Sequence, residues 1–369
     1  MKKKILLDCS SINAGGGAQV SISFLKDLID NNLSKNYCLY LSLELMKLCE
    51  NQKIKIYEEF NEVRVRKFPY IVSIFYNSIW YKNFDVVFNI FGPPYFLFKP
   101  KKIISGMARA QIFYPDIFWE KDVLARSITK IKALIHKLIY KYRVDIIVVE
   151  AKHVKKKCKM FFSKKIIVVG NCLSRNFVSS AKKSKKLKKL KKLKKVKSKF
   201  NLLYVGANYS HKNLHILGDA ISNASIYLKQ PIKLITTLKE KEYYNLPKRL
   251  KKISLNLGII SALELKSAYY KSTAVIFPSL LESFSITPIE AMFCKKPLIA
   301  SDRDFIREFC MKIPYYFNPV RSKSITCAII KCLMDLKKNS ARLNKGRKIS
   351  EKYNNSLVRT KKYISIINE

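Results

Sequence analysis

The segment that decides the fold reads Phe277-Pro-Ser-Leu-Leu-Glu-Ser-Phe-Ser-Ile-Thr-Pro-Ile-Glu-Ala-Met292. An apolar strand is expected to end at Phe277, and Thr287-Pro288 is typical of the cap and first residue of a helix. Such a strand–loop–helix unit places its loop at the carboxyl end of the strand, where open α/β sheets bind ligands. Glu282 on the loop and Glu290 in the first helical turn then bring two carboxylates to one crevice. A helix start needs only its cap, so the additional acid on the loop predicts a binding site.

Short β-branched runs alternate with longer helical patterns along the whole chain, which is typical of parallel α/β architecture. The runs are almost continuously apolar, as in sheets that are covered on both faces. The 369 residues suit two domains of about 150–200 residues each. Strands are expected at residues 4–9, 37–41, 85–90, 102–105, 145–149, 165–169, 201–205, 232–236, 253–257, 274–277, 297–300 and 315–317. Helices are expected at residues 18–30, 122–142, 214–228, 262–271 and 288–293, among others.

The boundary between the domains is expected in a lysine-rich stretch, residues 182–199, whose apolar residues recur every third position. This spacing drifts around a helix and does not form one face. Two compatible interpretations stay open. The stretch is a solvated, self-repelling linker, or it contacts an anionic membrane at about 1 kcal/mol per well-placed lysine. The predicted division is a domain at 1–175, a linker at 176–199, a domain at 200–345 and a C-terminal helix at 346–369 that returns to the first domain.

The chain is strongly basic, with 72 Lys and Arg against 26 Asp and Glu and a formal net charge of +46. Such a field attracts polyanions, whether nucleic acid, anionic lipid or phosphorylated substrates. A nucleic-acid-binding protein is therefore the rival class. Against it, no nucleic-acid-binding module is recognised, and the lysine-rich stretch lacks interleaved aromatic residues for base stacking.

The cysteine pattern and the hydrophobic runs indicate the cellular compartment. Nine cysteines are scattered without a Cys-x-x-Cys pair, which favours reduced thiols in a cytoplasmic protein. No window has about 18 uninterrupted apolar residues, so no transmembrane helix is expected.

Two further loops have sequences that suit phosphate binding. Asn13-Ala-Gly-Gly-Gly-Ala-Gln19 follows an expected strand and opens an expected helix, so its glycines would let backbone amides approach a phosphate. A tight strand-to-helix turn explains the same glycines. In Tyr204-Val-Gly-Ala-Asn-Tyr-Ser-His-Lys-Asn-Leu214, Lys212 is expected in the first turn of a helix, where a cation opposes the helix dipole. A lysine in such a position favours the binding of an anionic ligand, although an ordinary surface lysine remains the alternative.

The spacing Pro-Ser-x-x-Glu-Ser-Phe-x-x-x-Pro-x-Glu-Ala-Met of the opening segment resembles the hallmark of retaining glycosyltransferase family 4. The resemblance extends to Gly15–Gly17, to Val205-Gly206 with Lys212-Asn213, to Leu257-Gly258 with the residues at 263–269, and to Pro297-Leu-Ile-Ala-Ser-Asp302. It therefore spans most of the C-terminal half and the first loop of the N-terminal half. It implies the GT-B fold, in which two Rossmann-like domains face a central cleft. The N-terminal domain would bind the acceptor and the C-terminal domain the nucleotide sugar.

Carried over position by position, the resemblance implies a role for each candidate residue. Glu290 would hold the ribose hydroxyls of the nucleotide. Glu282 and Lys212 would be the catalytic residues, in contact with the donor sugar and the diphosphate respectively. The other donor-site positions are backbone amides near the phosphates and sugar and apolar residues near the base: Gly16, Gly17, Ser283, Phe284, Ser285, Ile286, Ile259 and Ile260.

The chain departs from the family pattern at several positions. The arginine common after the Val-Gly pair is Ala207, and His211 and Arg303 are candidates to replace its charge. The glycine often found three residues after Glu282 is Ser285, which could narrow the donor pocket. On the acceptor side, Arg109 stands roughly where part of the family has a histidine.

No metal site is expected, because the four histidines do not cluster. The Asp-x-Asp at Asp302 and Asp304 is expected to end a strand and cap a helix.

The resemblance implies an enzyme that transfers a sugar from a nucleotide-diphosphate sugar to a glycan or lipid-linked glycan acceptor, with retention of configuration. The expected pathway is bacterial capsule, O-antigen or lipopolysaccharide biosynthesis, and no cofactor is expected. The expected location is the cytoplasm, at the inner face of the membrane, with residues 182–199 as the anionic-membrane contact and no nucleic-acid partner. A catalytically silent glycosyltransferase-like scaffold is the other alternative, because Ala207 removes one diphosphate cation.

Overall fold

The computed structural model describes residues 3–67, 70–96, 98–113, 123–179 and 198–369. It divides into two compact units, the first formed by Met1–Cys172 with Asn355–Glu369 and the second by Leu173–Asn354. Of the predicted linker at 176–199, residues 180–197 lie outside the described residues, as does the start of the helix expected at 122.

The first unit contains a seven-stranded parallel sheet in the order β3-β2-β1-β4-β5-β6-β7. The chain moves outward from β1 in one direction and then in the other, so the order reverses between β1 and β4. The strands are β1 Ile5–Cys9, β2 Tyr37–Ser42, β3 Glu62–Arg66, β4 Val86–Asn89, β5 Lys102–Met107, β6 Ile146–Val149 and β7 Lys165–Val168. The helices are α1 Gly15–Asp30, α2 Leu43–Asn51, α3 Ile56–Glu59, α4 Tyr70–Tyr81, α5 Val123–Arg143, α6 Lys152–Lys159 and α17 Ser356–Asn368.

The second unit repeats this plan with a six-stranded parallel sheet in the order β10-β9-β8-β11-β12-β13. Its switch point lies between β8 and β11. The strands are β8 Phe200–Tyr204, β9 Ile232–Thr236, β10 Ser254–Asn256, β11 Ala274–Phe277, β12 Leu298–Ser301 and β13 Tyr315–Phe317. The helices are α7 Arg175–Ser179, α9 Leu217–Leu228, α10 Glu240–Tyr244, α11 Lys248–Ile253, α12 Ala262–Lys271, α13 Thr287–Phe293, α14 Asp304–Cys310, α15 Ser322–Met334 and α16 Ser340–Ser350.

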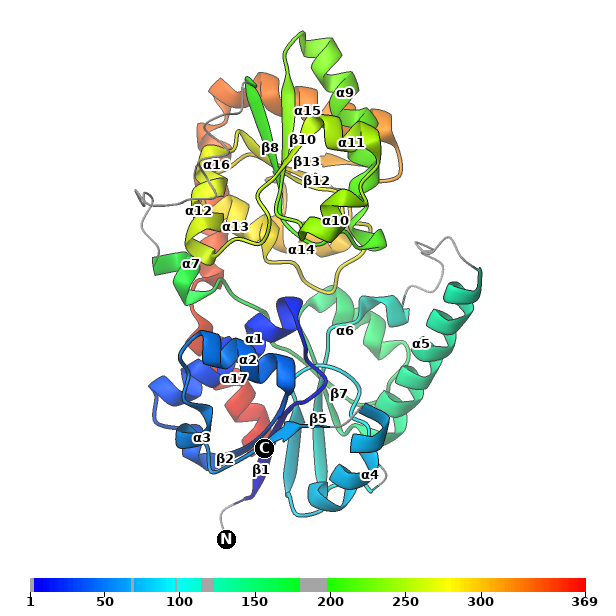
Figure 1. Ribbon diagram of the computed structural model, residues 1–369, viewed down its shortest axis with the longest axis vertical. Helices are drawn as coiled ribbons and strands as arrows, with labels where there is room; N and C mark the ends of the chain where they lie inside the picture. The colour runs from blue at the N-terminus through cyan, green and yellow to red at the C-terminus, as the bar shows by residue number, and fades with distance from the viewer. Residues whose placement is uncertain (1–2, 68–69, 97, 114–122, 180–197) are drawn as a thin grey trace. The chain divides into compact units, whose positions relative to one another are not determined.

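The last helix of the chain, α17, packs in the first unit against α1 (Figure 1). Asp27 of α1 is fully buried and accepts hydrogen bonds from the Ser356 hydroxyl at 3.0 Å and the Thr360 hydroxyl at 2.7 Å. The rings of Phe24 and Tyr363 meet edge to face, with 5.2 Å between their centroids. A buried carboxylate with two donors is well satisfied, so these contacts tie the end of the chain to its first helix.

The two parallel sheets confirm the expected α/β architecture, and most expected strands are present within one or two residues of their bounds. The strand β3 was not among those expected. Its sequence, Glu-Val-Arg-Val-Arg, alternates charged and apolar residues. It lies at the edge of the sheet, where charged side chains are common because they block further pairing.

Candidate functional site

The candidate donor site lies at the switch point of the second unit, where the loops after β8 and β11 leave neighbouring strands of the sheet. Crevices at this place in open α/β sheets are common ligand sites. Leu280 on the second loop donates a backbone hydrogen bond of 2.8 Å to the carbonyl of His211 on the first. The two loops on which the sequence predicted Lys212 and Glu282 are therefore joined directly.

Lys212 and Glu282 form an ion pair at the meeting of these loops. The Nζ of Lys212 lies 2.5 Å from Oε1 of Glu282, and the side chains are only 16% and 11% exposed. The ammonium also lies 5.6 Å from the centre of the Phe277 ring. Water screens a pair this sheltered only weakly. Any anion that contacts Lys212 therefore meets the Glu282 carboxylate as well.

The expectation that Lys212 lies in the first turn of a long helix is wrong in detail. Lys212 ends a short 3₁₀ turn, η3 Ser210–Lys212, and a second turn, η4 Leu214–Ile216, follows before α9 begins at Leu217. The cause is Asn213, which has a left-handed backbone with a φ of 55°. The argument from the dipole of a long helix therefore does not apply to Lys212.

Asn213 holds the lysine loop in place. Its side-chain amide donates to the carbonyl of Pro319 at 2.7 Å and to that of Pro278 at 3.3 Å, and the residue is buried. The second of these carbonyls directly follows β11. Asn213 therefore joins the lysine loop to the loop that carries Glu282, and its left-handed backbone suits asparagine or glycine.

We expect Asn213→Ala to lower the free energy of unfolding by about 2–4 kcal/mol, since it loses two buried hydrogen bonds and forces alanine into the left-handed region. Asn213→Gly loses the same bonds without that strain and should cost about 1 kcal/mol less. Chemical denaturation of both variants measures the difference. Equal stability of the wild type and the alanine variant would contradict this role.

Glu290 lies in α13, close to its start, and is buried, with 7% of its surface exposed. The hydroxyl of the fully buried Tyr269 on α12 donates a 2.8 Å hydrogen bond to its Oε2. Burial raises the pKa of the Glu290 carboxyl to about 7, although the Tyr269 bond opposes that shift. Near neutral pH this carboxyl is thus close to its midpoint of ionisation, a property found often at functional sites.

The other predicted donor-site residues have different surroundings. Ser283 and Phe284 are buried, and the Phe284 ring packs edge to face on Phe309 with 4.7 Å between centroids. Phe284 therefore offers a ligand only its backbone. Ser285 and Ile286 are half-buried. Ile260 is half-buried and Ile259 is exposed, both just after Gly258, whose φ is +71°.

Ala207, at the position of the missing arginine, and the two candidates to replace its charge lie at the carboxyl end of the second sheet, as Lys212 does. Ala207 accepts a 2.8 Å hydrogen bond from the Tyr204 hydroxyl through its carbonyl. His211 is near Lys212 and Glu282, and burial lowers its pKa. Arg303 follows β12, and its buried Nε has no hydrogen-bond partner among the described residues. Arg303 is thus a cation with an unused buried donor near the switch point.

The Asp-x-Asp segment lies between β12 and α14. Asp302 makes a two-pronged ion pair with Arg307, with bonds of 2.5 and 2.7 Å, and Asp304 begins α14. Within the described ranges, no group of three or more His, Cys, Asp or Glu residues is arranged to hold a metal ion.

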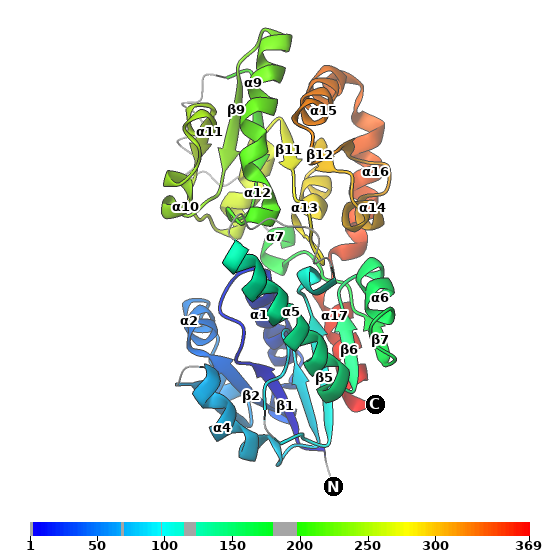
Figure 2. The same ribbon diagram turned by 90° about the vertical axis from the view of Figure 1, so that its right-hand side faces the viewer.

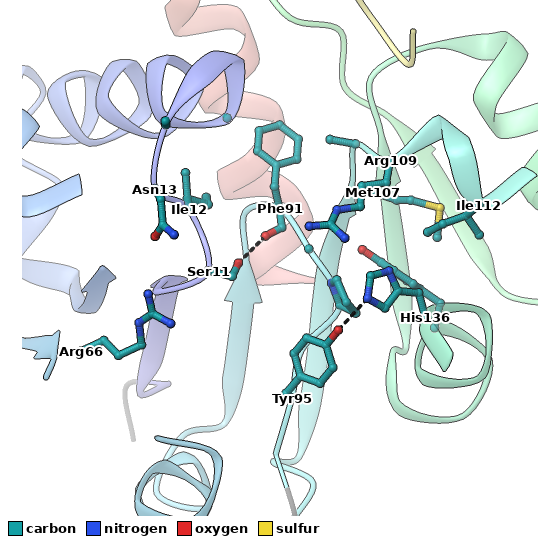
Figure 3. Close-up of a pocket in the computed structure, with 16 residues that line it drawn as sticks. Ser11, Ile12, Asn13, Arg66, Phe91, Tyr95, Met107, Arg109, Ile112 and His136 are labelled. Atoms are coloured by element: carbon teal, nitrogen blue, oxygen red, sulfur yellow. Dashed lines mark hydrogen bonds between the residues drawn. The ribbon is translucent and has the colours of Figure 1, made fainter. Parts of the chain in front are cut away.

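The first unit has a separate cavity of about 430 Å³ at the carboxyl ends of β1, β4 and β5. Figure 3 shows Arg109 and His136 on one side of it and Asn13 and Arg66 on the other. Gly17, in the first turn of α1, also lines it. The structure thus brings two sequence candidates, Gly17 and Arg109, to one cavity; Gly16 lies in the same helix turn without lining it.

This cavity also contains a tyrosine–histidine pair that was not predicted from the sequence. The Tyr95 hydroxyl and Nε2 of His136 share a hydrogen bond of 2.6 Å. Burial, together with the charges of Arg109 and Lys132, lowers the pKa of His136 to about 4. The imidazole is therefore neutral at pH 7. A histidine that was considered only as a possible metal ligand thus forms part of a polar cavity wall.

The comparisons with known proteins agree with this organisation. Residues 185–348 match the family model described as "Glycosyl transferases group 1", and this range lies within the second unit. The O-antigen chain mannosyltransferase RfbU of Salmonella typhimurium is 31% identical over 226 residues, which cover 59% of this chain and 56% of RfbU. The chain thus matches little more than half the length of this curated relative.

Solved structures resemble the whole chain. HepE from Anabaena in complex with UDP-glucose has a TM-score of 0.72 at 14% identity, with 99% of each chain covered. A glycosyltransferase from Rickettsia africae has a TM-score of 0.72 at 16% identity, covering 99% of this chain and 98% of the other. WaaG, a glycosyltransferase involved in lipopolysaccharide biosynthesis, has a TM-score of 0.72 at 10% identity, covering 98% and 99%. These likenesses confirm the expected fold class, two Rossmann-like parallel-sheet domains of the GT-B type.

Proposed function

We propose that this chain is a glycosyltransferase of the retaining family 4 type. It moves a sugar from a nucleotide-diphosphate sugar to a lipid-linked or polysaccharide acceptor in the biosynthesis of a bacterial surface glycan. The observation that carries the proposal is the group of Lys212, Glu282 and Glu290 around one switch point. All three lie inside the range that matches the family model.

In the proposed reaction Lys212 stabilises the departing diphosphate. The bond from the anomeric carbon to phosphate breaks while negative charge grows on the phosphate oxygens, and a sheltered ammonium stabilises that charge more than one in open water. Glu282, paired with Lys212, holds that ammonium in place and faces the donor sugar, which gains positive character.

Glu290 holds the nucleotide through its ribose. An ionised carboxylate accepts hydrogen bonds from two neighbouring hydroxyls, and such charge-assisted bonds are stronger than neutral ones. Tyr269 fixes the carboxylate in one orientation through its 2.8 Å bond. This arrangement favours a ribonucleotide donor and leaves the base open.

Retention is proposed to follow from attack on the face that the diphosphate leaves. The acceptor oxygen bonds to the anomeric carbon, the carbon–phosphate oxygen bond breaks, and the departing phosphate takes the acceptor's proton. Neither a protein nucleophile nor a metal is part of this step. Measurement of the anomeric configuration of donor and product by NMR tests it, and an inverted product would refute it.

The acceptor is proposed to bind in the cavity of the first unit. Its wall combines the Tyr95–His136 pair with Arg109 and aromatic side chains. Aromatic faces and a few fixed polar groups are the usual composition of a pocket that orients its ligand.

We expect Tyr95→Phe to raise the KM for the acceptor about tenfold, since it removes one bound hydroxyl from a half-buried site. The KM for the donor should stay unchanged. Tyr57→Phe is the matched control, because Tyr57 is 62% exposed in the same unit. Steady-state kinetics with each substrate varied measures both constants, and an unchanged acceptor KM would contradict the assignment.

A screen of donors tests the proposed activity itself. RfbU is described as a mannosyltransferase, and HepE is in complex with UDP-glucose, so GDP-mannose and UDP-glucose come first, followed by dTDP-sugars. Each is incubated with the protein and a lipid-pyrophosphate glycan, with and without EDTA. We expect one donor to release nucleotide in step with glycan product in both conditions. A panel without binding or turnover would refute the proposal.

A further inference from the structure

Helix α5 presents a continuous row of large apolar side chains to solvent. The row follows a spacing of three and four residues, so 3.6 residues per turn bring its members to one side of the helix. Every member is at least 43% exposed. The row consists of Leu124, Ile128, Ile131, Ile135, Leu138 and Tyr142, with Leu134 beside it.

The opposite side of α5 is the one that packs on the protein. His136 and Tyr140 are buried there and line the cavity of the first unit. Figure 2 shows α5 crossing the face of the first unit turned toward the viewer, with no described element in front of it. The apolar row is therefore an outward surface of a helix that is anchored on its other side.

Basic residues flank the apolar row on both sides. With 100° per residue, Lys132 and Arg143 project on one flank, and Lys130 and Lys141 on the other. The helix, Val-Leu-Ala-Arg-Ser-Ile-Thr-Lys-Ile-Lys-Ala-Leu-Ile-His-Lys-Leu-Ile-Tyr-Lys-Tyr-Arg, has no acidic residue. An apolar stripe between two basic flanks is typical of a helix that lies in the interface of an anionic membrane.

We propose that α5 is a membrane-docking helix, which lies flat on a bilayer of anionic phospholipid with its apolar row inserted between the headgroups. Its 21 residues form a contact about 30 Å long at 1.5 Å per residue. No helix among the described residues is long and apolar enough to span a bilayer. The contact therefore depends on insertion of the row and on the basic flanks.

A second copy of the chain suits this surface poorly. In a symmetric pair of α5 helices the basic flanks of both copies would meet, because the helix has no acid to pair with them. The net charge of +46 adds repulsion between whole chains. An anionic lipid surface complements the same charges.

This docking also has a consequence that rests on the proposed function. The cavity lies against the inner side of α5, so one helix diameter, about 10 Å, separates it from the bilayer surface. A lipid-linked acceptor would then reach the cavity with its lipid still in the membrane.

The test measures the partition of the full chain onto vesicles by flotation. We compare vesicles of phosphatidylglycerol mixed with phosphatidylcholine against vesicles of phosphatidylcholine alone. The variant Ile131→Gln/Leu134→Gln/Leu138→Gln, called the row variant, removes two exposed row residues and the exposed Leu134 beside them, and it keeps good helix formers. We expect its partition onto the anionic vesicles to fall at least about tenfold. The matched control, Ile226→Gln/Tyr227→Gln/Met334→Gln, removes three even more exposed apolar residues of the second unit and should bind like the wild type.

A second pair of variants tests the charges. Lys132→Gln/Lys141→Gln takes one exposed lysine from each flank and should weaken anionic binding several-fold at low salt and little at high salt. Lys337→Gln/Lys338→Gln, exposed on the second unit, should change it less. Circular dichroism and the unfolding midpoint check that each variant folds.

Several results would overturn the proposal. The first is an unchanged partition of the row variant onto anionic vesicles, and the second is an equal loss of partition in its control. The third is a wild type that forms dimers and does not bind vesicles, together with a row variant that does not form dimers. The assay contains no sugar donor, so a failure of the proposed transferase activity leaves its outcome unaffected.

Discussion

Replacing Lys212 by methionine is expected to lower kcat/KM for sugar transfer by about 100- to 1000-fold, the scale seen when an enzyme loses one preorganised charge partner of its transition state. The ammonium is sheltered and faces the loops of the switch point, so water replaces it poorly. A steady-state assay with the identified donor measures the change. Lys239→Met, an exposed lysine of the same unit, is the matched control.

The same substitution leaves the Glu282 carboxylate without its cation, which is expected to cost about 3 kcal/mol or more of stability. The double variant Lys212→Met/Glu282→Gln removes both charges and should recover most of that stability. It should not recover activity. A double variant that regains transfer would mean that Lys212 acts only by neutralising Glu282, which would contradict its role at the diphosphate.

Replacing Glu290 by glutamine is expected to weaken nucleotide binding about 10- to 100-fold, because bonds to an ionised carboxylate become bonds to a neutral amide. The pKa of Glu290 is about 7, so wild-type affinity should rise with pH through that value as the carboxyl ionises. The variant should lack this rise. Calorimetry of both proteins at each pH separates this effect from ionisation of the nucleotide, and equal affinities throughout would exclude the ribose role.

Glu290 also predicts a pH dependence of stability. Burial raises its pKa from 4.5 to about 7 in the folded protein, so the folded state holds the proton more tightly than the unfolded chain. This difference contributes up to about 3 kcal/mol to the free energy of unfolding. The contribution is fully present below about pH 4.5 and is lost as the pH rises through 7. Glu290→Gln should therefore be the more stable protein at pH 8. Denaturation curves of both proteins at pH 5 and pH 8 measure this, and a wild type that matches the variant at pH 8 would contradict it.

The sequence predicted the fold well because most strands of the two parallel sheets are predominantly apolar. Residues 232–236, 274–277 and 315–317 were expected as strands with the bounds that the structure has. The edge strand β3 escaped because its charged residues break the apolar run. The start of α9 was predicted too early, because a single asparagine such as Asn213 does not show in the sequence that its backbone is left-handed.

The candidate site was predictable only where one short segment carries it. Glu282 and Glu290 are close in sequence, so the segment itself predicted a shared binding site, and the resemblance to the family implied a role for each. The partner of Glu290, Tyr269, stands 21 positions earlier, and no periodicity links the two. The bond between Tyr95 and His136 also spans 41 positions. The pattern of residues 122–142 predicted a helix, but which side of it packs on the protein depends on the sheet beneath.

One measurement tests the central claim most directly, namely that the Lys212–Glu282 site transfers sugar from a nucleotide donor. Nucleotide sugars labelled in the sugar are incubated with the wild type and with Lys212→Met/Glu282→Gln, in the presence of a lipid-linked acceptor. The account predicts that label from one donor enters the glycan, with equimolar nucleotide released, and that the folded double variant loses at least 99% of this transfer, in line with a loss of about 100-fold or more. Transfer at the same rate by the double variant, or no transfer from any donor by the wild type, would contradict it.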